Sequence, residues 1–132
     1  MRLSTEQFYE AMAAVEAAGV PRGADRRGGG RLCVLAFVEM ASYAPGKLGP
    51  ERRVTLNDLA AGGVSVTVDE PLTAGEQFFL RLPSRDGRPP LVLLCAARNC
   101  RSTAEGFRVG AAFLACGEGS IADVCRRLPE AA

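Results

Sequence analysis

The spacing of hydrophobic residues predicts a helix at the start of the chain. Over residues 4–18, Phe8 and Val15 recur at helical spacing with alanines beside them. Ser4 followed by Gln7 matches a capping box, in which each residue caps the other's backbone N–H. We therefore expect an amphipathic helix that packs on the remainder of the chain or on a partner copy.

From residue 32 the pattern becomes that of strands. Val64, Val66 and Val68 alternate with polar residues, which predicts a half-buried strand. The other segments are apolar or alternating runs of strand length, separated by turn-forming glycine and proline. The six predicted strands are residues 32–38, 53–57, 64–68, 78–82, 91–97 (continuing towards Cys100) and 107–114.

The short links between these strands favour antiparallel pairing, because parallel crossovers need a dozen or more residues. A closed barrel then removes exposed strand edges. A short C-terminal helix follows, with Ser120 and Asp123 as a capping pair. The predicted fold is mainly β: a six-stranded antiparallel β-barrel with an N-terminal helix and a short C-terminal helix.

The length of 132 residues predicts one domain with four segments. These are an N-terminal helix (1–19), an Arg/Gly-rich flexible ligand loop (20–31), the barrel (32–116) and a C-terminal helix and tail (117–132). By composition, the second segment fits a linker, an RNA-binding RGG-like tract or a clamp that orders on a ligand. The residues alone leave all three open.

Charge and cysteine usage narrow the class of protein. The net charge of +1 indicates no bulk attraction to nucleic acid or membrane. The five cysteines form no C-x-x-C pair, so we expect thiols in a reducing cytoplasm and no metal site. We recognise no signal peptide and no apolar run of membrane-spanning length, so the expected location is cytoplasmic.

An enzyme is not predicted. The sequence has no histidine, which removes the usual general base. Lys47 lies in a Gly/Pro-rich loop without an evident nucleophile, and the pair Asp69 and Glu70 fits a solvated turn at a strand end. We therefore expect no catalytic residue and no cofactor.

Binding is better supported than catalysis. Arg27 and Arg31 flank three glycines before the first strand, and guanidinium groups can grip phosphate, stack on purines and read guanine N7 and O6. Asp58 could accept hydrogen bonds from the N1–H and N2–H groups of guanine. Gly62 and Gly63 permit close backbone approach. The alternatives are a turn-capping role for Asp58 and a plain turn or bulge at the glycines.

Taken together, these residues resemble the motifs of the PilZ domain, a bacterial receptor module for cyclic di-GMP. The family pattern is R-x-x-x-R in an N-terminal loop, then D/N-x-S-x-x-G between two barrel strands. Arg27 and Arg31 match the first motif, Arg26 supplies the doubled arginine often found there, and Asp58 and Gly63 match the second.

The resemblance extends over about residues 26–116 and includes the closing strand at residues 106–113. It departs from the family at Ala60, where a serine is usual. Losing one hydrogen bond of that kind costs on the order of 0.5–1.5 kcal/mol, which weakens a site without abolishing it.

The resemblance implies a cyclic di-GMP receptor without a chemical step. Arg26, Arg27 and Arg31 would hold phosphates and guanine faces, Asp58 would read a guanine edge, and Gly63 would let the ligand approach. The arginine loop would order on binding and signal to a protein partner, and a homodimer is possible. The alternative is a degenerate adaptor that has lost the nucleotide. An RNA-binding barrel is a third class, disfavoured because few exposed aromatic residues are available for base stacking.

Overall fold

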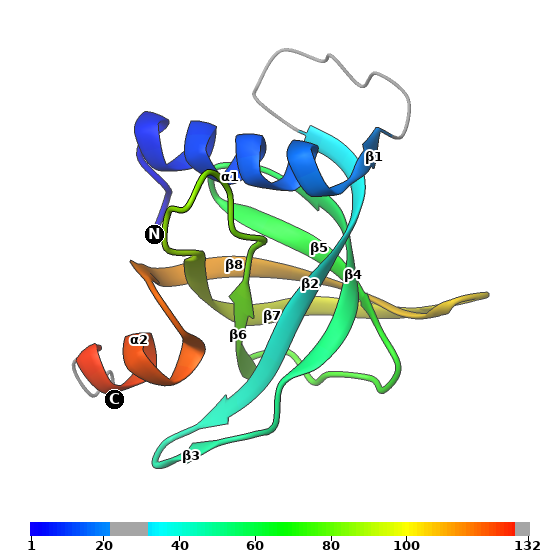
Figure 1. Ribbon diagram of the computed structural model, residues 1–132. Helices are drawn as coiled ribbons and strands as arrows, with labels where there is room; N and C mark the ends of the chain where they lie inside the picture. The colour runs from blue at the N-terminus through cyan, green and yellow to red at the C-terminus, as the bar shows by residue number, and fades with distance from the viewer. Residues whose placement is uncertain (22–31, 129–132) are drawn as a thin grey trace.

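Six antiparallel strands close into a barrel within the part of the chain that the computed structural model describes, residues 1–21 and 32–128 (Figure 1). Their hydrogen-bonded order is β2, β4, β5, β8, β7 and β6, and β6 pairs with β2 to close the barrel. Closure pairs both edges of every barrel strand, and the predicted fold class is confirmed. The barrel strands are β2 (Leu32–Ala44), β4 (Arg52–Leu59), β5 (Gly63–Val68), β6 (Gln77–Arg81), β7 (Leu91–Thr103) and β8 (Gly106–Glu118).

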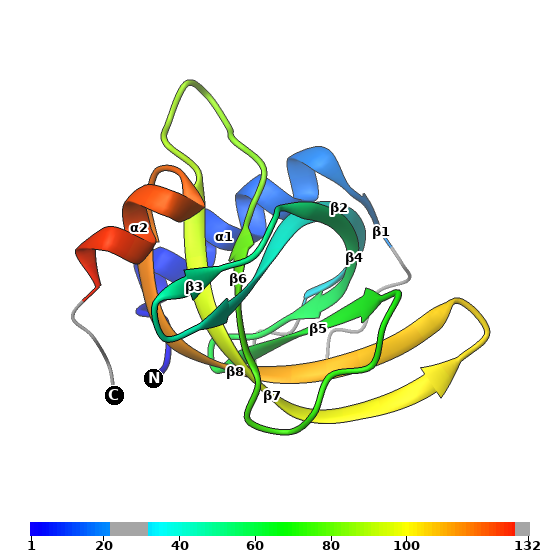
Figure 2. The same ribbon diagram turned by 90° about the horizontal axis from the view of Figure 1, so that it is seen from below.

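Several strands are longer than their apolar runs predicted. β4 runs on to Leu59 because this residue pairs with Leu32 of β2 on one side and Val64 of β5 on the other. β7 and β8 form a long hairpin that extends past the barrel (Figure 2). β5 and β6 stand on opposite sides of the ring, so the connection at residues 69–76 crosses from one side to the other.

Two short strands flank β2. β1 (Val20–Pro21) pairs with its first half, and β3 (Lys47–Leu48) pairs with its last two residues. The region of β3 was expected to be loop. The tight turn at Pro45 and Gly46, where Gly46 has a φ of 75°, folds the chain back into register with β2.

The N-terminal helix α1 (Thr5–Ala18) lies across one end of the barrel (Figure 1). The predicted capping box is present: Gln7 N donates to Ser4 Oγ, and Ser4 N donates to Gln7 Oε1. The buried face of α1, including Phe8 and Val15, joins the same hydrophobic cluster as the inward side chains of the strands. The helix therefore closes the core at this end.

The C-terminal helix α2 (Ile121–Arg127) covers part of the outer barrel surface (Figure 2). Its predicted cap is confirmed, because Asp123 N donates to Ser120 Oγ. Ile121 and Val124 pack on Phe79 of β6 and on neighbouring β2 and β7 residues in a second hydrophobic cluster. Strict alternation places Phe79 on the solvent side of β6, but α2 buries it there completely.

Two β-bulges change which side chains face outward. Val54 and Leu56 point into the core, and simple alternation would send Asp58 inward as well. The pairing of β4 with β5 shifts by one residue between Leu56 and Asp58, so Leu59 faces the core instead. Asn57 is the extra residue, and both Asn57 and Asp58 lie on the outer face.

A matching shift in β7 falls between Ala97 and Asn99. Ala97 and Cys100 pack on the core, which leaves Arg98 and Asn99 exposed on the outer surface. Each bulge thus presents two consecutive polar side chains on the outside of the barrel.

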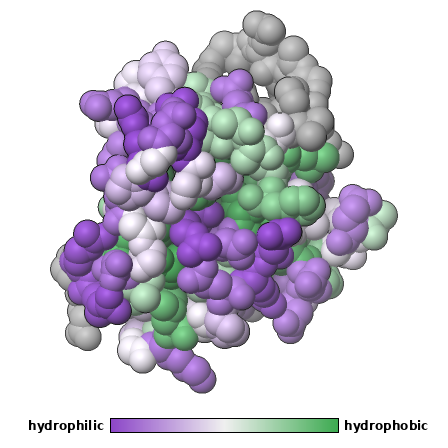
Figure 3. All heavy atoms as spheres, viewed as in Figure 1, coloured by the Kyte–Doolittle hydropathy of each residue, from purple (hydrophilic) through white to green (hydrophobic). Residues whose placement is uncertain are grey.

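The face seen in Figure 3 is largely hydrophilic, including its upper left, and its apolar residues gather in the upper centre and right of the view. In residues 1–21 and 32–128, neither helix is long and apolar enough to cross a membrane.

Replacing Phe79 by alanine should lower the free energy of unfolding by about 3–5 kcal/mol, because truncating a fully buried ring leaves a cavity beneath α2. Phe37 on β2 is the matched control. Phe37 is 64% exposed, so Phe37→Ala should lower the free energy of unfolding by less than about 1 kcal/mol. Urea unfolding followed by circular dichroism measures both, and equal losses would contradict the packing of α2 on β6.

Candidate ligand-binding site

The second motif lies where β4 turns into β5. Asp58 is opposite Ser65 in the register of β4 and β5, Ser65 is opposite Gly110 of β8, and Gly110 is opposite Asn99 of β7. These four residues form one row across four strands on the outer face. The two bulges fix both ends of the row.

An ion pair holds Asp58 in place. Arg108 Nη2 donates to Asp58 Oδ2 at 2.8 Å, and Arg108 Nε donates to Ser65 Oγ at 2.9 Å. The Asp58 side chain is 11% exposed and that of Arg108 is 31% exposed, so the pair lies at the edge of solvent. Asp58 is therefore part of a charged network joining β4, β5 and β8.

A broad depression of about 900 Å³ opens over this row. Gly62, Gly63 and Gly110 are among the residues that line it. A Cβ on Gly110 would lie 2.9 Å from Asn99 Oδ1, so the Asn99 amide lies across that glycine. The depression is shallow and has polar groups at its edges.

Positive charge predominates around the depression. Among the described residues that line it, Arg2, Arg98, Arg101 and Arg108 are cationic, and Asp58 is the only carboxylate. Arginine forks bind phosphate and carboxylate groups bidentately. This arrangement suits an anionic ligand with hydrogen-bonding edges.

The arginine motif, Arg26, Arg27 and Arg31, lies outside the described residues. Its attachment point is nevertheless fixed, because β2 begins at Leu32, which pairs with Leu59. The next β2 residue, Cys33, pairs with Asp58. The first two residues of β2 therefore lie beside the second motif.

The structure gives Gly63 a packing role that the sequence did not predict. A Cβ at this position would lie 2.3 Å from the backbone oxygen of Ala111 on β8, closer than any real side chain can approach. The glycine is therefore required by the contact between strands. It also lines the depression, where close approach by a ligand remains a prediction.

Ala60 begins the turn between the strands and lines the same depression. Its backbone N–H donates to Gly63 O at 2.9 Å. Its methyl group cannot replace the hydroxyl expected at this motif position, but Ser65 supplies a hydroxyl on the adjacent strand within the same depression.

The turn also contacts the N-terminal segment. Leu3 N donates to Ala61 O at 2.8 Å, and Phe113 N donates to Gly62 O at 3.2 Å. Leu3 is buried, and Arg2 lies over Gly62 at the rim of the depression. These contacts connect the motif directly to the residues that start α1.

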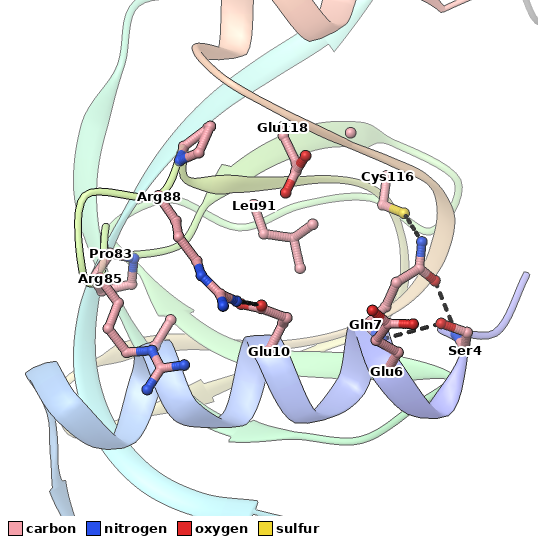
Figure 4. Close-up of a pocket in the computed structure, with 13 residues that line it drawn as sticks. Ser4, Glu6, Gln7, Glu10, Pro83, Arg85, Arg88, Leu91, Cys116 and Glu118 are labelled. Carbon is pink, nitrogen blue, oxygen red and sulfur yellow. Dashed lines mark hydrogen bonds and ion pairs between the residues drawn. The ribbon is translucent and has the colours of Figure 1, made fainter.

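A second depression, of about 490 Å³, lies between α1 and the loop that joins β6 to β7 (Figure 4). Arg88 of that loop forms an ion pair with Glu10 of α1. Gln7 Nε2 donates to Cys116 Sγ at 3.1 Å, while burial raises the pKa of the Cys116 thiol above its usual value. These contacts fasten α1 to the barrel, and no residue of the second motif is among the described residues that line this depression.

The described part of the chain offers little support for a metal site or a reactive cysteine. It contains no cluster of three or more His, Cys, Asp and Glu residues placed to hold a metal ion. Burial raises the pKa of Cys95 far above its usual value, so this thiol remains protonated. Asp69 and Glu70 are exposed after β5, as the sequence suggested, and Glu70 pairs with Arg52.

Sequence reasoning missed four contributors to the site: Arg2, Arg98, Arg101 and Arg108. Each of them is one arginine among fifteen and lies far from both motifs along the chain. A signal was present for Arg108, because it alternates with Val109 and so belongs to the outer face of the closing strand. Nothing in the sequence paired it with Asp58.

Gly63→Ala should destabilise the fold by about 1–3 kcal/mol, because the added methyl group meets the β8 backbone. Gly62→Ala is the matched control, since a Cβ there meets only an Arg2 side-chain nitrogen, at 3.4 Å. Chemical denaturation of the two variants should separate them clearly. A Gly63→Ala protein as stable as Gly62→Ala would refute the packing role.

Comparison with known protein families identifies residues 25–126 as a PilZ domain. A search of curated proteins finds no match. The matched region contains the arginine motif, the second motif, the whole barrel and most of α2. It covers most of the chain and contains the site built by the two bulges, apart from Arg2. The chain therefore belongs to the PilZ domain family, a family of cyclic di-GMP receptors and adaptors.

Proposed function

We propose that this domain binds cyclic di-GMP in the depression over β4, β5, β8 and β7, and signals the bound state to a protein partner. The observation that carries the proposal is the position of the second motif beside the start of β2. Leu32, which follows Arg31 in the sequence, pairs with Leu59, which follows Asp58. The short chain distance from Arg31 to β2 supports a shared site for the arginines and the carboxylate.

The charge of the depression supports this ligand. Cyclic di-GMP carries two phosphate groups and two guanines. The four described arginines at the rim complement the phosphates, and Arg26, Arg27 and Arg31 of the motif would add to them. Asp58 offers the acceptor that the guanine N1–H and N2–H groups need. The volume of about 900 Å³ falls within the range of small-molecule sites.

The output is mechanical. The segment carrying Arg26, Arg27 and Arg31 would order over the bound nucleotide, as in an order–disorder switch. The turn at residues 60–63 would transmit the event to α1 through the hydrogen bond from Leu3 to Ala61. A changed surface around α1 would then recruit or release the partner. No chemical step is involved, and no cofactor is required.

Isothermal titration calorimetry with cyclic di-GMP tests the proposal. We expect affinity in the micromolar range, because one motif hydroxyl is absent at Ala60 and its loss costs up to about tenfold. Arg31→Ala and Asp58→Ala should each abolish detectable binding, since one removes a phosphate or guanine contact and the other removes the acceptor.

Arg53→Ala is the control, because this exposed arginine on β4 contacts Glu39 and Phe37 and does not line the depression. It should bind as the unchanged protein does. GTP and cyclic di-AMP serve as ligand controls. If the unchanged protein gives no heat at high cyclic di-GMP concentration, the receptor function is wrong and an adaptor that works by protein contact alone replaces it.

A further inference from the structure

We propose that Arg108 and Asp58 act as one reader of guanine, in which Asp58 accepts from the donor groups of the base and Arg108 donates to its O6 acceptor. The inference rests on the proposed function, because it concerns the same depression. It assigns base discrimination to a β8 residue outside both motifs.

The geometry presents a donor group beside an acceptor group. Arg108 Nη2 lies 2.8 Å from Asp58 Oδ2, and both residues line the depression. Guanine displays O6 next to N1–H and N2–H along one edge. A carboxylate can accept from both N–H groups, while an adjacent guanidinium donates to O6. The pair on the protein therefore has the complementary order of groups.

Arg108 has donors to spare for this contact. Its two hydrogen bonds use the donor on Nε and one on Nη2, whereas a guanidinium carries five donors in all. The group can therefore contact a ligand while Ser65 and Asp58 hold it. Anchoring by two partners also fixes the plane of the guanidinium before the ligand arrives, which reduces the entropy lost on binding.

The floor of the depression leaves room for a base beside this pair. Gly110 lies in the row directly beyond Ser65, and Gly63 lies opposite Ala112 one row away. The Asn99 amide lies over Gly110 and the β8 backbone abuts Gly63, so the space for a ring is the depression itself and not the place of the missing side chains. Asn99, lying over Gly110, bounds the space on the far side.

Adenine is rejected by the same arrangement. It places an amino donor where guanine has O6, so this group would face the donors of Arg108. It also lacks the N1–H and N2–H groups that Asp58 would accept from, so the base gains no hydrogen bond from the carboxylate. Sites built on such hydrogen bonds reject the mismatched analogue strongly, because buried polar groups then lose their partners.

The test is the ratio of affinities for cyclic di-GMP and cyclic di-AMP, measured by competition against labelled cyclic di-GMP. Arg108→Met keeps the length of the side chain but removes its donors. It should weaken cyclic di-GMP binding by about 10- to 100-fold. Cyclic di-AMP binding should weaken much less, because it loses only the general attraction of the charge, so the ratio falls. Arg108→Lys should show part of the same fall, because an ammonium lacks the planar fork.

Arg101→Met is the matched control. Arg101 of β7 is directly opposite Arg108 in register and lines the same depression. Its replacement by methionine removes the same charge. Lost phosphate attraction should weaken both ligands equally and leave the ratio unchanged. Thermal melting confirms that each variant is folded.

An Arg108→Met protein with unchanged affinities would show that Arg108 serves only to brace the strands. Equal loss of affinity for both nucleotides would show that Arg108 contacts phosphate. Tighter cyclic di-GMP binding would show that Arg108 blocks access to Asp58. Each result overturns the inference while leaving the proposed function intact. Failure of the unchanged protein to bind cyclic di-GMP overturns both.

Discussion

The one-residue shift between β4 and β5 is the constraint on which the candidate site depends. Alternation would carry Asp58 into the apolar core beside Leu56, where an unpaired carboxylate is very costly. The extra residue, Asn57, reverses the alternation, and its side-chain amide donates to Thr67 Oγ1 at 2.8 Å. Leu59 then fills the core position, and Asp58 reaches Arg108 on the outer face.

The rest of the site follows from closing the barrel. In the closed barrel, β5 pairs with β8 and β8 pairs with β7. This pairing brings three features to the same face as Asp58: Ser65, Arg108 and the exposed residues of the β7 bulge. Closing the barrel also seals the core beneath that face, so the outer surface is free to carry charge. Glycines line this face, and Gly63 is required there because the β8 backbone abuts it.

The position of α1 gives the site a physical route to the rest of the molecule. The helix closes one end of the barrel, and the residues before it bond to the turn that follows Asp58. On its other side α1 is fastened by the Arg88–Glu10 and Gln7–Cys116 contacts (Figure 4). A displacement at the turn would therefore be opposed by contacts on the far side of α1.

Local chemistry in the sequence determined the elements of this protein. The Ser4–Gln7 box, the valines of β5 and the cap at Ser120 specify a helix start, a strand and a second helix start from neighbouring residues alone. The two motifs were also recognisable from the sequence alone. Tertiary structure decided what no local pattern contains: the burial of Phe79 by α2, the outward turn of Asp58 and its pairing with Arg108, 50 residues away. Those features depend on register shifts and strand pairings, which arise only when distant segments compete for the same core.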